Sequence, residues 1–295
     1  MRYSPPISAC LVLGGVLAIS TFAGWPRQVF SQKDQKQRGS GISSDATPVD
    51  GERGERLQTM KQAAAEYTLC VQADDRIKLK LHSEPVLRWS NPVRGTTDGA
   101  VFIWTAGGRP EAAAGIYKWY SESGEPDMEH EISSLSVHNL IAERGNRTVW
   151  NPSMPGVELS AIPDAPQPAE SVPARLRQMR SLAGEFRAFH NKPNNPEELR
   201  LLPQPLYRYE NTEPGLLDGA MFAFVQATDP EVLLLIEARR KEAGYAWQYA
   251  VARMTSVPLR AQHKDQEVWR VPDCWANVTD RQAPYTAFFR QRLGQ

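Results

Sequence analysis

The chain contains an internal duplication, and this feature constrains its fold more than any other. Sliding the sequence by 120 positions aligns residues 85–117 with residues 205–237 without a gap, and 11 of the 33 aligned residues are identical. Composition alone gives roughly two identities over such a length. At an offset of 119 the flanking matches are Arg56-Leu57 with Arg175-Leu176, and Val149-Trp150 with Val268-Trp269. The duplication therefore predicts two tandem repeats of similar fold.

The N-terminal residues have the pattern of a targeting segment. Arg2 precedes an apolar stretch at residues 7–25, and small residues follow it, as at a signal-peptidase site. The sequence predicts export to the periplasm or the medium. An uncleaved segment is just long enough to anchor the protein in a membrane. We expect no other contact with a membrane.

Changes in composition divide the chain further. Residues 32–54 carry almost no large apolar side chain, which is typical of a disordered spacer. Residues 153–173 are rich in proline and predict an extended linker. The predicted organisation is a signal peptide or anchor at 1–31, a spacer at 32–54, repeat 1 at 55–152, the linker at 153–173, and repeat 2 with a C-terminal segment at 174–295.

Each repeat shows a helical pattern followed by alternating patterns. Apolar residues three and four positions apart, such as Leu57, Met60 and Ala64, predict a helix at the start of repeat 1. Ser171 and Gly184 mark the start and end of the matching helix in repeat 2. Later segments alternate with a period of two, which indicates strands. The predicted fold class is α+β: two repeats, each with one helix on an antiparallel sheet of four to five strands, related by a pseudo-twofold axis. A short amphipathic helix is expected at 285–293.

The repeated Asp-Gly-Ala at Asp98 and Asp218 is the sharpest local signal. An Asp-Gly pair before an apolar strand is typical of a tight turn, because aspartate caps its own backbone and glycine supplies a positive φ. Alternatively, two carboxylates that a pseudo-twofold axis brings together form the paired acids of a hydrolase. The sequence favours the turn.

Arginines lie ten residues before both aspartates, at Arg88 and Arg208. A hairpin between the segments would place each arginine beside its aspartate, as an ion pair that supports the fold. The alternative is an anion site built by Arg88 and Arg208 with Asn91 and Asn211 across the two repeats.

The two cysteines after the leader, Cys70 and Cys274, can pair in a disulfide in an oxidising compartment. The alternative is that Cys70 is an inert core residue. Among the tryptophans, Trp119, Trp247 and Trp275 are the candidates for a binding surface.

The sequence offers no support for a cofactor or a metal. The segment Met128–Glu131 begins like a zinc-protease helix, but Ser134 stands where the second histidine belongs. Phosphate-loop, dinucleotide and nucleophile-elbow motifs are missing from the sequence. The 34 basic and 34 acidic residues balance, so that we expect no nucleic-acid partner.

Three segments of the sequence, at residues 86–92, 98–102 and 202–209, resemble segments of a family of uncharacterised exported bacterial proteins with a tandem repeat. The resemblance implies export and no known activity. We predict a non-catalytic binding or interaction protein of the cell envelope, with an unidentified protein or small molecule as its partner. The alternative is an unrecognised hydrolase with Asp98, Asp218, Arg88 and Arg208 at a cleft between the repeats.

Overall fold

The computed structural model describes residues 48–72, 76–91, 96–120, 126–192, 195–210, 212–242 and 244–288. The chain divides into two units, Met1–Asp45 and Ala46–Gln295, and every described residue belongs to the second. The predicted leader and residues 32–47 of the predicted spacer lie outside the described residues. The remainder of that spacer, residues 48–54, is helical, because the first helix already begins at Pro48.

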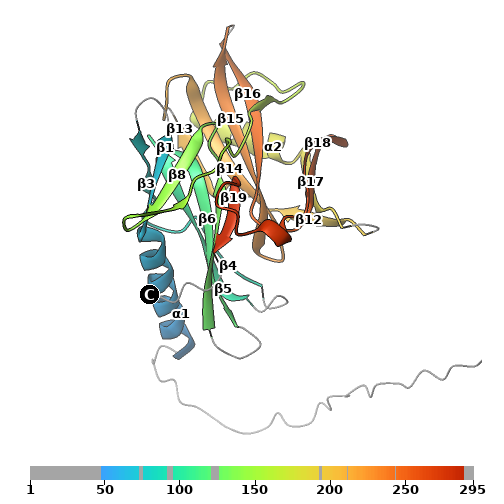
Figure 1. Ribbon diagram of the computed structural model, residues 1–295. Coiled ribbons are helices and arrows are strands. Elements are labelled where there is room, and N and C mark those ends of the chain that lie inside the picture. The colour runs from blue at the N-terminus through green and yellow to red at the C-terminus, as the bar shows by residue number, and fades with distance from the viewer. Residues whose placement is uncertain are drawn as a thin grey trace, which may run out of the picture. The chain divides into compact units, whose positions relative to one another are not determined.

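We call the part of the chain from the first helix to β9 the first half (Figure 1). Its elements are α1 (Pro48–Ala65), β1 (Tyr67–Gln72), β2 (Ile77–Lys78), β3 (Lys80–Leu81), β4 (Leu87–Asn91), β5 (Thr96–Ala106), β6 (Arg109–Tyr120), β7 (Pro126–Ser134), β8 (Asn139–Arg144) and β9 (Arg147–Trp150).

The second half runs from the second helix to β18. Its elements are α2 (Val172–Ala183), β11 (Phe186–His190), β12 (Glu197–Leu201), β13 (Tyr207–Glu210), β14 (Leu216–Gln226), β15 (Asp229–Lys241), β16 (Gly244–Arg253), β17 (Leu259–His263) and β18 (Gln266–Val271). The elements outside the halves are β10 (Ser160–Ala161) in the linker, and the 3₁₀ helix η2 (Trp275–Asn277) and β19 (Tyr285–Phe288) near the C-terminus.

The described residues are mostly β-sheet with two helices, which confirms a mixed α and β composition. The strands form sheets of four, six and nine strands, so the prediction of four to five strands holds for one sheet only. The second half has one large sheet in the order β10-β16-β15-β14-β12-β11-β17-β18, with β13 also paired to β14. The first half has its strands in two sheets, β2-β1-β8-β9 and β19-β7-β6-β5-β3, with β4 paired to β5.

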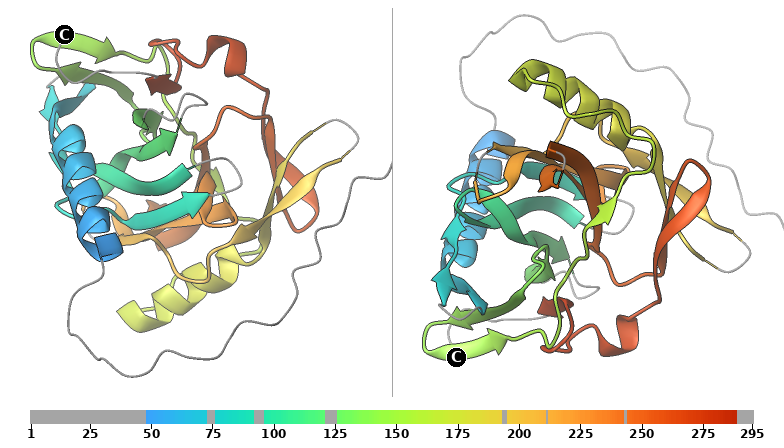
Figure 2. Two further views of the ribbon diagram at one scale, coloured as in Figure 1. Left: turned by 90° about the horizontal axis from the view of Figure 1, so that it is seen from below. Right: turned by 90° about the horizontal axis from the view of Figure 1, so that it is seen from above.

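Alternation along the central strands separates two kinds of core. Ala100, Phe102 and Trp104 of β5 pack with Met60 and the other apolar residues of α1. Ala220, Phe222 and Phe224 of β14 pack with α2 in the same way. The residues between them, such as Val101 and Met221, form a third core that both halves share. The two long sheets therefore meet face to face, and each helix lies on the outer face of its own sheet (Figure 2).

The predicted boundaries of the second helix are confirmed. Ser171 is its N-cap and Gly184 its C-cap, with a proline in the first turn, where the missing N–H costs nothing. Met179, Leu182 and Ala183 turn inward from α2 and are buried.

The predicted C-terminal helix is wrong in the described part. Tyr285–Phe288 form the strand β19, which pairs antiparallel with β7, with Phe288 opposite His130. All four of its residues are buried. An edge strand has unpaired backbone groups. The strand β7 would be such an edge in the first half, and β19, near the C-terminus, pairs with it. Residues 289–293 lie outside the described residues.

Hairpin tips fasten the two halves to each other. The β5–β6 hairpin turns at Gly107 and Gly108, both with positive φ, and an added Cβ at Gly107 would overlap the backbone oxygen of Thr212. At the β14–β15 hairpin the Thr228 hydroxyl donates to the backbone oxygen of Ser90 over 2.7 Å. Each half thus holds the hairpin tip of the other.

Candidate functional sites

The ion pair predicted between Arg88 and Asp98 is present. Arg88 donates from Nε and Nη2 to the two oxygens of Asp98, at 2.8 and 2.5 Å. A second arginine, Arg56 of α1, donates to the same carboxylate over 3.1 Å. Burial acts to raise the pKa of Asp98, but the hydrogen bonds from Arg88 and Arg56 outweigh it and lower the pKa. The carboxylate therefore joins the helix to the sheet.

The second pair repeats this arrangement. Arg208 donates to both oxygens of Asp218, at 3.1 and 2.6 Å, and Arg175 of α2 donates to Asp218 Oδ2 over 2.7 Å. Asp218 is fully buried and Arg175 is nearly so. The repeated arginine of the helix was visible in the alignment, but no pattern in the sequence indicated that it contacts the aspartate 43 positions away.

The predicted Asp-Gly turn is wrong. Asp98-Gly99 and Asp218-Gly219 lie inside the long strands β5 and β14, beside a bulge in each. The glycines allow an aromatic ring to pack directly against the strand. An added Cβ at Gly99 would overlap the indole of Trp89, and one at Gly219 would overlap the ring of Tyr209. The aspartates serve the arginine pairs described above.

The structure does not bring the two Arg–Asp pairs together. Asp98 precedes Ala100 on the face of β5 that packs against α1, and Asp218 precedes Ala220 on the face of β14 that packs against α2. The shared core between the two sheets lies between these faces. Asn91 donates instead to Asp229 over 3.1 Å, while Asn211 lies outside the described residues. Among the described residues, the two Arg–Asp pairs of the predicted anion site and hydrolase cleft therefore lie on separate faces.

A buried ion network joins the two sheets. Arg109, 1% exposed, donates to Glu237 and to Glu111 over 2.9 Å each. The Tyr209 hydroxyl and Arg239 also donate to Glu237, at 2.7 and 2.5 Å. Burial of Glu237 acts to raise its pKa, but attraction to Arg109 and Arg239 outweighs it and lowers the pKa. The network compensates its own charges and is a structural contact between the halves.

Several carboxylates lie close to one another elsewhere between the sheets. The Tyr117 hydroxyl lies 2.9 Å from Glu129 and 2.7 Å from Glu131. One hydroxyl proton cannot serve two ionised acceptors fully, so the arrangement favours a proton on a carboxyl. Burial raises the pKa of Glu131 to about 8, and repulsion from Asp229, Glu231 and Glu129 adds to this effect, against the hydrogen bond from Tyr117.

The cluster around Glu131 predicts a pH dependence of stability. The folded protein keeps a proton on Glu131 that the unfolded chain releases above its ordinary pKa of about 4.5, so that stability falls between about pH 5 and pH 8. One proton corresponds to a slope of up to about 1.4 kcal/mol per pH unit. Glu131→Gln keeps a neutral side chain of the same shape. We expect the variant to gain stability over the wild type as pH rises through this window, measured by urea unfolding at several pH values.

The exposed Glu158 offers the matched control. Glu158→Gln is expected to leave the pH profile of unfolding parallel to that of the wild type. If Glu131→Gln also runs parallel, the raised pKa of Glu131 is refuted.

The predicted disulfide is not formed, since Cys70 and Cys274 are free thiols. Cys70 lies on β1 opposite Lys78 and Ile141, whereas Cys274 precedes η2 and bonds through its backbone to Ser256. Burial raises the pKa of the Cys274 thiol. The Met128–Glu131 segment lies in the strand β7, so its residues alternate between faces and do not follow the helix of a zinc protease. The described residues contain no cluster of His, Cys, Asp and Glu with the arrangement of a metal site.

A groove of about 700 Å³, lined by both apolar and polar groups, opens between the linker and the second half. Tyr249 and Val251 of β16 line one side, Val268 and Trp269 of β18 another, and Val157 and Leu159 of the linker a third. The lining side chains with polar atoms are those of Glu158, Ser160, Tyr249 and Trp269. Its volume falls in the range of about 300–1,000 Å³ that is usual for small-molecule sites.

Backbone hydrogen bonds hold the linker wall of the groove in place. Gly156 and Val157 donate to the backbone oxygen of Ser136, at 3.0 and 3.3 Å, and Ile162 donates to that of Trp247 over 3.0 Å. Between these anchors β10 pairs with Tyr249 and Gln248 of β16. The wall is therefore a fixed strand-like segment, and the groove is open without movement of the linker.

The matching place in the first half is covered. Trp150, which the alignment matches with Trp269, is fully buried and donates from its indole nitrogen to the backbone oxygen of Ala283 over 2.8 Å. Asn151 and Ser153 also bond to the C-terminal segment, and Phe288 of β19 joins the core beneath. Trp269 remains half-buried at the open groove.

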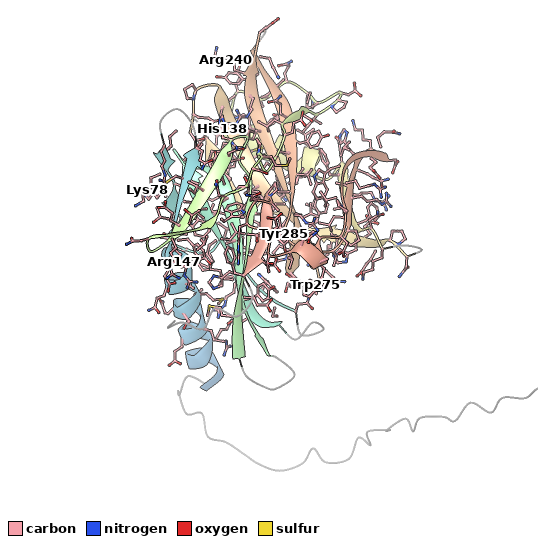
Figure 3. All side chains as sticks on the ribbon, in the orientation of Figure 1. Lys78, His138, Arg147, Arg240, Trp275 and Tyr285 are labelled. Carbon is pink, nitrogen blue, oxygen red and sulfur yellow. The ribbon has the colours of Figure 1, made fainter. Side chains whose placement is uncertain are left out.

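The tryptophans predicted for a binding surface differ in their positions. Trp247 is buried in the second-half core, and the side chain of Trp119 lies outside the described residues. Trp275 is 64% exposed on η2, below Tyr285 of β19 in Figure 3. The residues that line the groove were missed, because nothing in their sequence distinguishes them from core residues.

A scan of protein-family models and searches of curated proteins and of solved structures find no match to this chain. Among the described residues, neither helix has the length and apolar character that crossing a membrane requires.

Proposed function

We propose that this chain is a non-catalytic, exported binding protein of the cell envelope that holds an apolar ligand in the groove of its second half. The observation that carries the proposal is the groove of about 700 Å³ beside Trp269. The corresponding surface of the first half is closed by the C-terminal segment. The surface beside Trp150 is covered, whereas the equivalent surface beside Trp269 forms a groove. This difference is consistent with selection for binding in the second half.

We also propose that the two halves are copies of one ancestral unit, related by a pseudo-twofold axis. The strand pairing supports this proposal, because Arg88 stands opposite Ala100 and Arg208 opposite Ala220 in the same register. The duplicated Arg–Asp pairs then belong to the ancestral fold. The proposal of export rests on the leader sequence and on the resemblance to exported bacterial proteins, and N-terminal sequencing of the mature protein tests it.

The groove is tested with a neutral apolar fluorophore, N-phenyl-1-naphthylamine. We expect saturable binding to the protein and quenching of Trp269. Val268→Trp fills the groove from β18, where Val268 is half-buried, and is expected to weaken binding at least about tenfold, which corresponds to 1.4 kcal/mol.

The control variant removes an aromatic side chain away from the groove. Trp275→Ala is expected to leave the affinity for the fluorophore unchanged. Circular dichroism and urea unfolding establish that both variants fold. Equal affinity of the wild type and Val268→Trp would refute the groove as the binding site.

A further inference from the structure

A second pocket, of about 360 Å³, lies beside α2 in the second half. Leu201 and Leu202 of the β12 end and Phe222 of β14 form its apolar floor. Arg177, Arg180 and Ser181 of α2 lie at its rim and are exposed. Residues three and four positions apart share one face of a helix, so the two guanidinium groups and the hydroxyl border the same opening.

The two arginines have no acidic partner. Neither Arg177 nor Arg180 makes an ion pair with any residue that the structure describes. The other arginine on the same helix, Arg175, is buried and fully engaged with Asp218 and with backbone oxygens. The rim therefore carries two positive charges without an acidic partner in the part of the chain that the structure describes.

In the first half, the cation at the position equivalent to Arg180 has an acidic partner. At an offset of 119, Lys61 matches Arg180, and Lys61 is paired with Glu84 over 2.5 Å. At an offset of 120, Glu84 matches Gln204. The strand pairing supports this alignment, because Leu81 stands opposite Trp104 and Leu201 opposite Phe224.

The second half has therefore lost the acid and gained a cation. Gln58 of the first half matches Arg177 at the offset of 119, so the second half also replaces a neutral side chain of the helix by an arginine. Both changes make the pocket more positive, while the leucine of the floor is kept at Leu81 and Leu201. The pocket thus combines a positive rim with an apolar floor. An anion with an apolar body fits both, because guanidinium groups bind carboxylates by charge-assisted hydrogen bonds and the floor receives the apolar part.

We propose that the pocket between α2 and the end of β12 is a binding site for a small amphipathic carboxylate. The carboxylate contacts Arg177 and Arg180, and the aliphatic chain lies on Leu201, Leu202 and Phe222. This site is separate from the groove beside Trp269, since the two share no lining residue. The proposal goes beyond the binding of an apolar ligand and does not depend on it.

The test uses octanoate, below its micelle concentration, and methyl NMR of the full chain. We expect octanoate to shift the methyl signals of Leu201 and Leu202 in a saturable manner. Acetate has the carboxylate without the long alkyl chain, and octyltrimethylammonium has the alkyl chain with a positive charge. Both are expected to bind at least about tenfold more weakly than octanoate. Signals of Val251 and Val268 report the groove separately, so that failure of one site is distinguishable from failure of the other.

The sharpest variant restores the acid that the first half has. Gln204→Glu is expected to pair with Arg180, as Glu84 pairs with Lys61, and to weaken octanoate binding about tenfold. Gln204→Ala is the matched control and is expected to bind octanoate as the wild type does. Position 204 is exposed, and unfolding curves establish that both variants fold.

The proposal is overturned if Gln204→Glu binds octanoate as tightly as Gln204→Ala. It is also overturned if the cationic amphiphile shifts the same methyl signals with equal affinity. Binding to vesicles of anionic lipid without binding of monomeric octanoate would overturn it too, in favour of a membrane surface.

Discussion

Substitution of Arg109 by methionine is expected to lower the free energy of unfolding by about 3–5 kcal/mol. Arg109 is buried between the two sheets and donates to Glu237 and Glu111. Methionine keeps much of the side-chain volume but leaves two buried carboxylates with less compensation. Urea unfolding at neutral pH measures the loss as a lower midpoint.

A double variant separates the lost charge from the lost packing. Arg109→Met with Glu237→Leu removes both members of the pair, and apolar replacement of a whole buried pair is often close to neutral. We expect the double variant to recover part of the stability, although Arg239 then loses its bond to Glu237. Arg187→Gln breaks the exposed pair with Glu198 and is expected to cost less than about 1 kcal/mol. Equal losses for Arg109→Met and Arg187→Gln would contradict the role of the buried network.

Asp218→Asn is the second substitution with a large expected effect, about 3–5 kcal/mol. The side chain keeps its shape, but its charge disappears while Arg175 and Arg208 stay in place. Arg175 has little access to water that would compensate it. The measurement is again the midpoint of urea unfolding, with m-values compared to establish that the transition remains two-state.

The equivalent variant in the first half, Asp98→Asn, is expected to lose less stability, because Arg56 and Arg88 reach solvent more than Arg175 does. The pair of variants also tests the hydrolase alternative. An enzyme with Asp98 and Asp218 in its active site would lose an activity in each variant without a loss of stability. A large loss of stability in Asp218→Asn would instead indicate that the duplicated aspartates are elements of the fold.

The duplicated residues show what the sequence can predict. Two arginines ten positions before two aspartates predicted the ion pairs correctly, because a hairpin brings such positions together whatever the rest of the fold is. The Asp-Gly turn was predicted wrongly. Gly99 and Gly219 are required because the rings of Trp89 and Tyr209 on the neighbouring strands leave no room for a Cβ. A local sequence pattern does not show which residues of another strand pack against it.

The candidate sites depend on contacts that are remote in sequence. The carboxylate cluster joins Glu131 to Asp229 and Glu231. The groove has one wall from the linker, which pairs with β16. The Arg177 and Arg180 pocket was not predicted, because the difference between Glu84 and Gln204 has a meaning only beside the Lys61–Glu84 pair of the structure. Both proposals of binding thus rest on differences between the repeats and not on their identities.

The pairing of β19 with β7 couples the order of folding to the order of synthesis. A ribosome delivers the strands of the first half long before Tyr285–Phe288, so the edge of β7 and the indole of Trp150 stay bare while the whole second half is made. Domains usually fold as they emerge, from the N-terminus onward. Here the half that is made first is closed last, and a nascent chain that stalls before Tyr285 presents an open sheet edge to its neighbours.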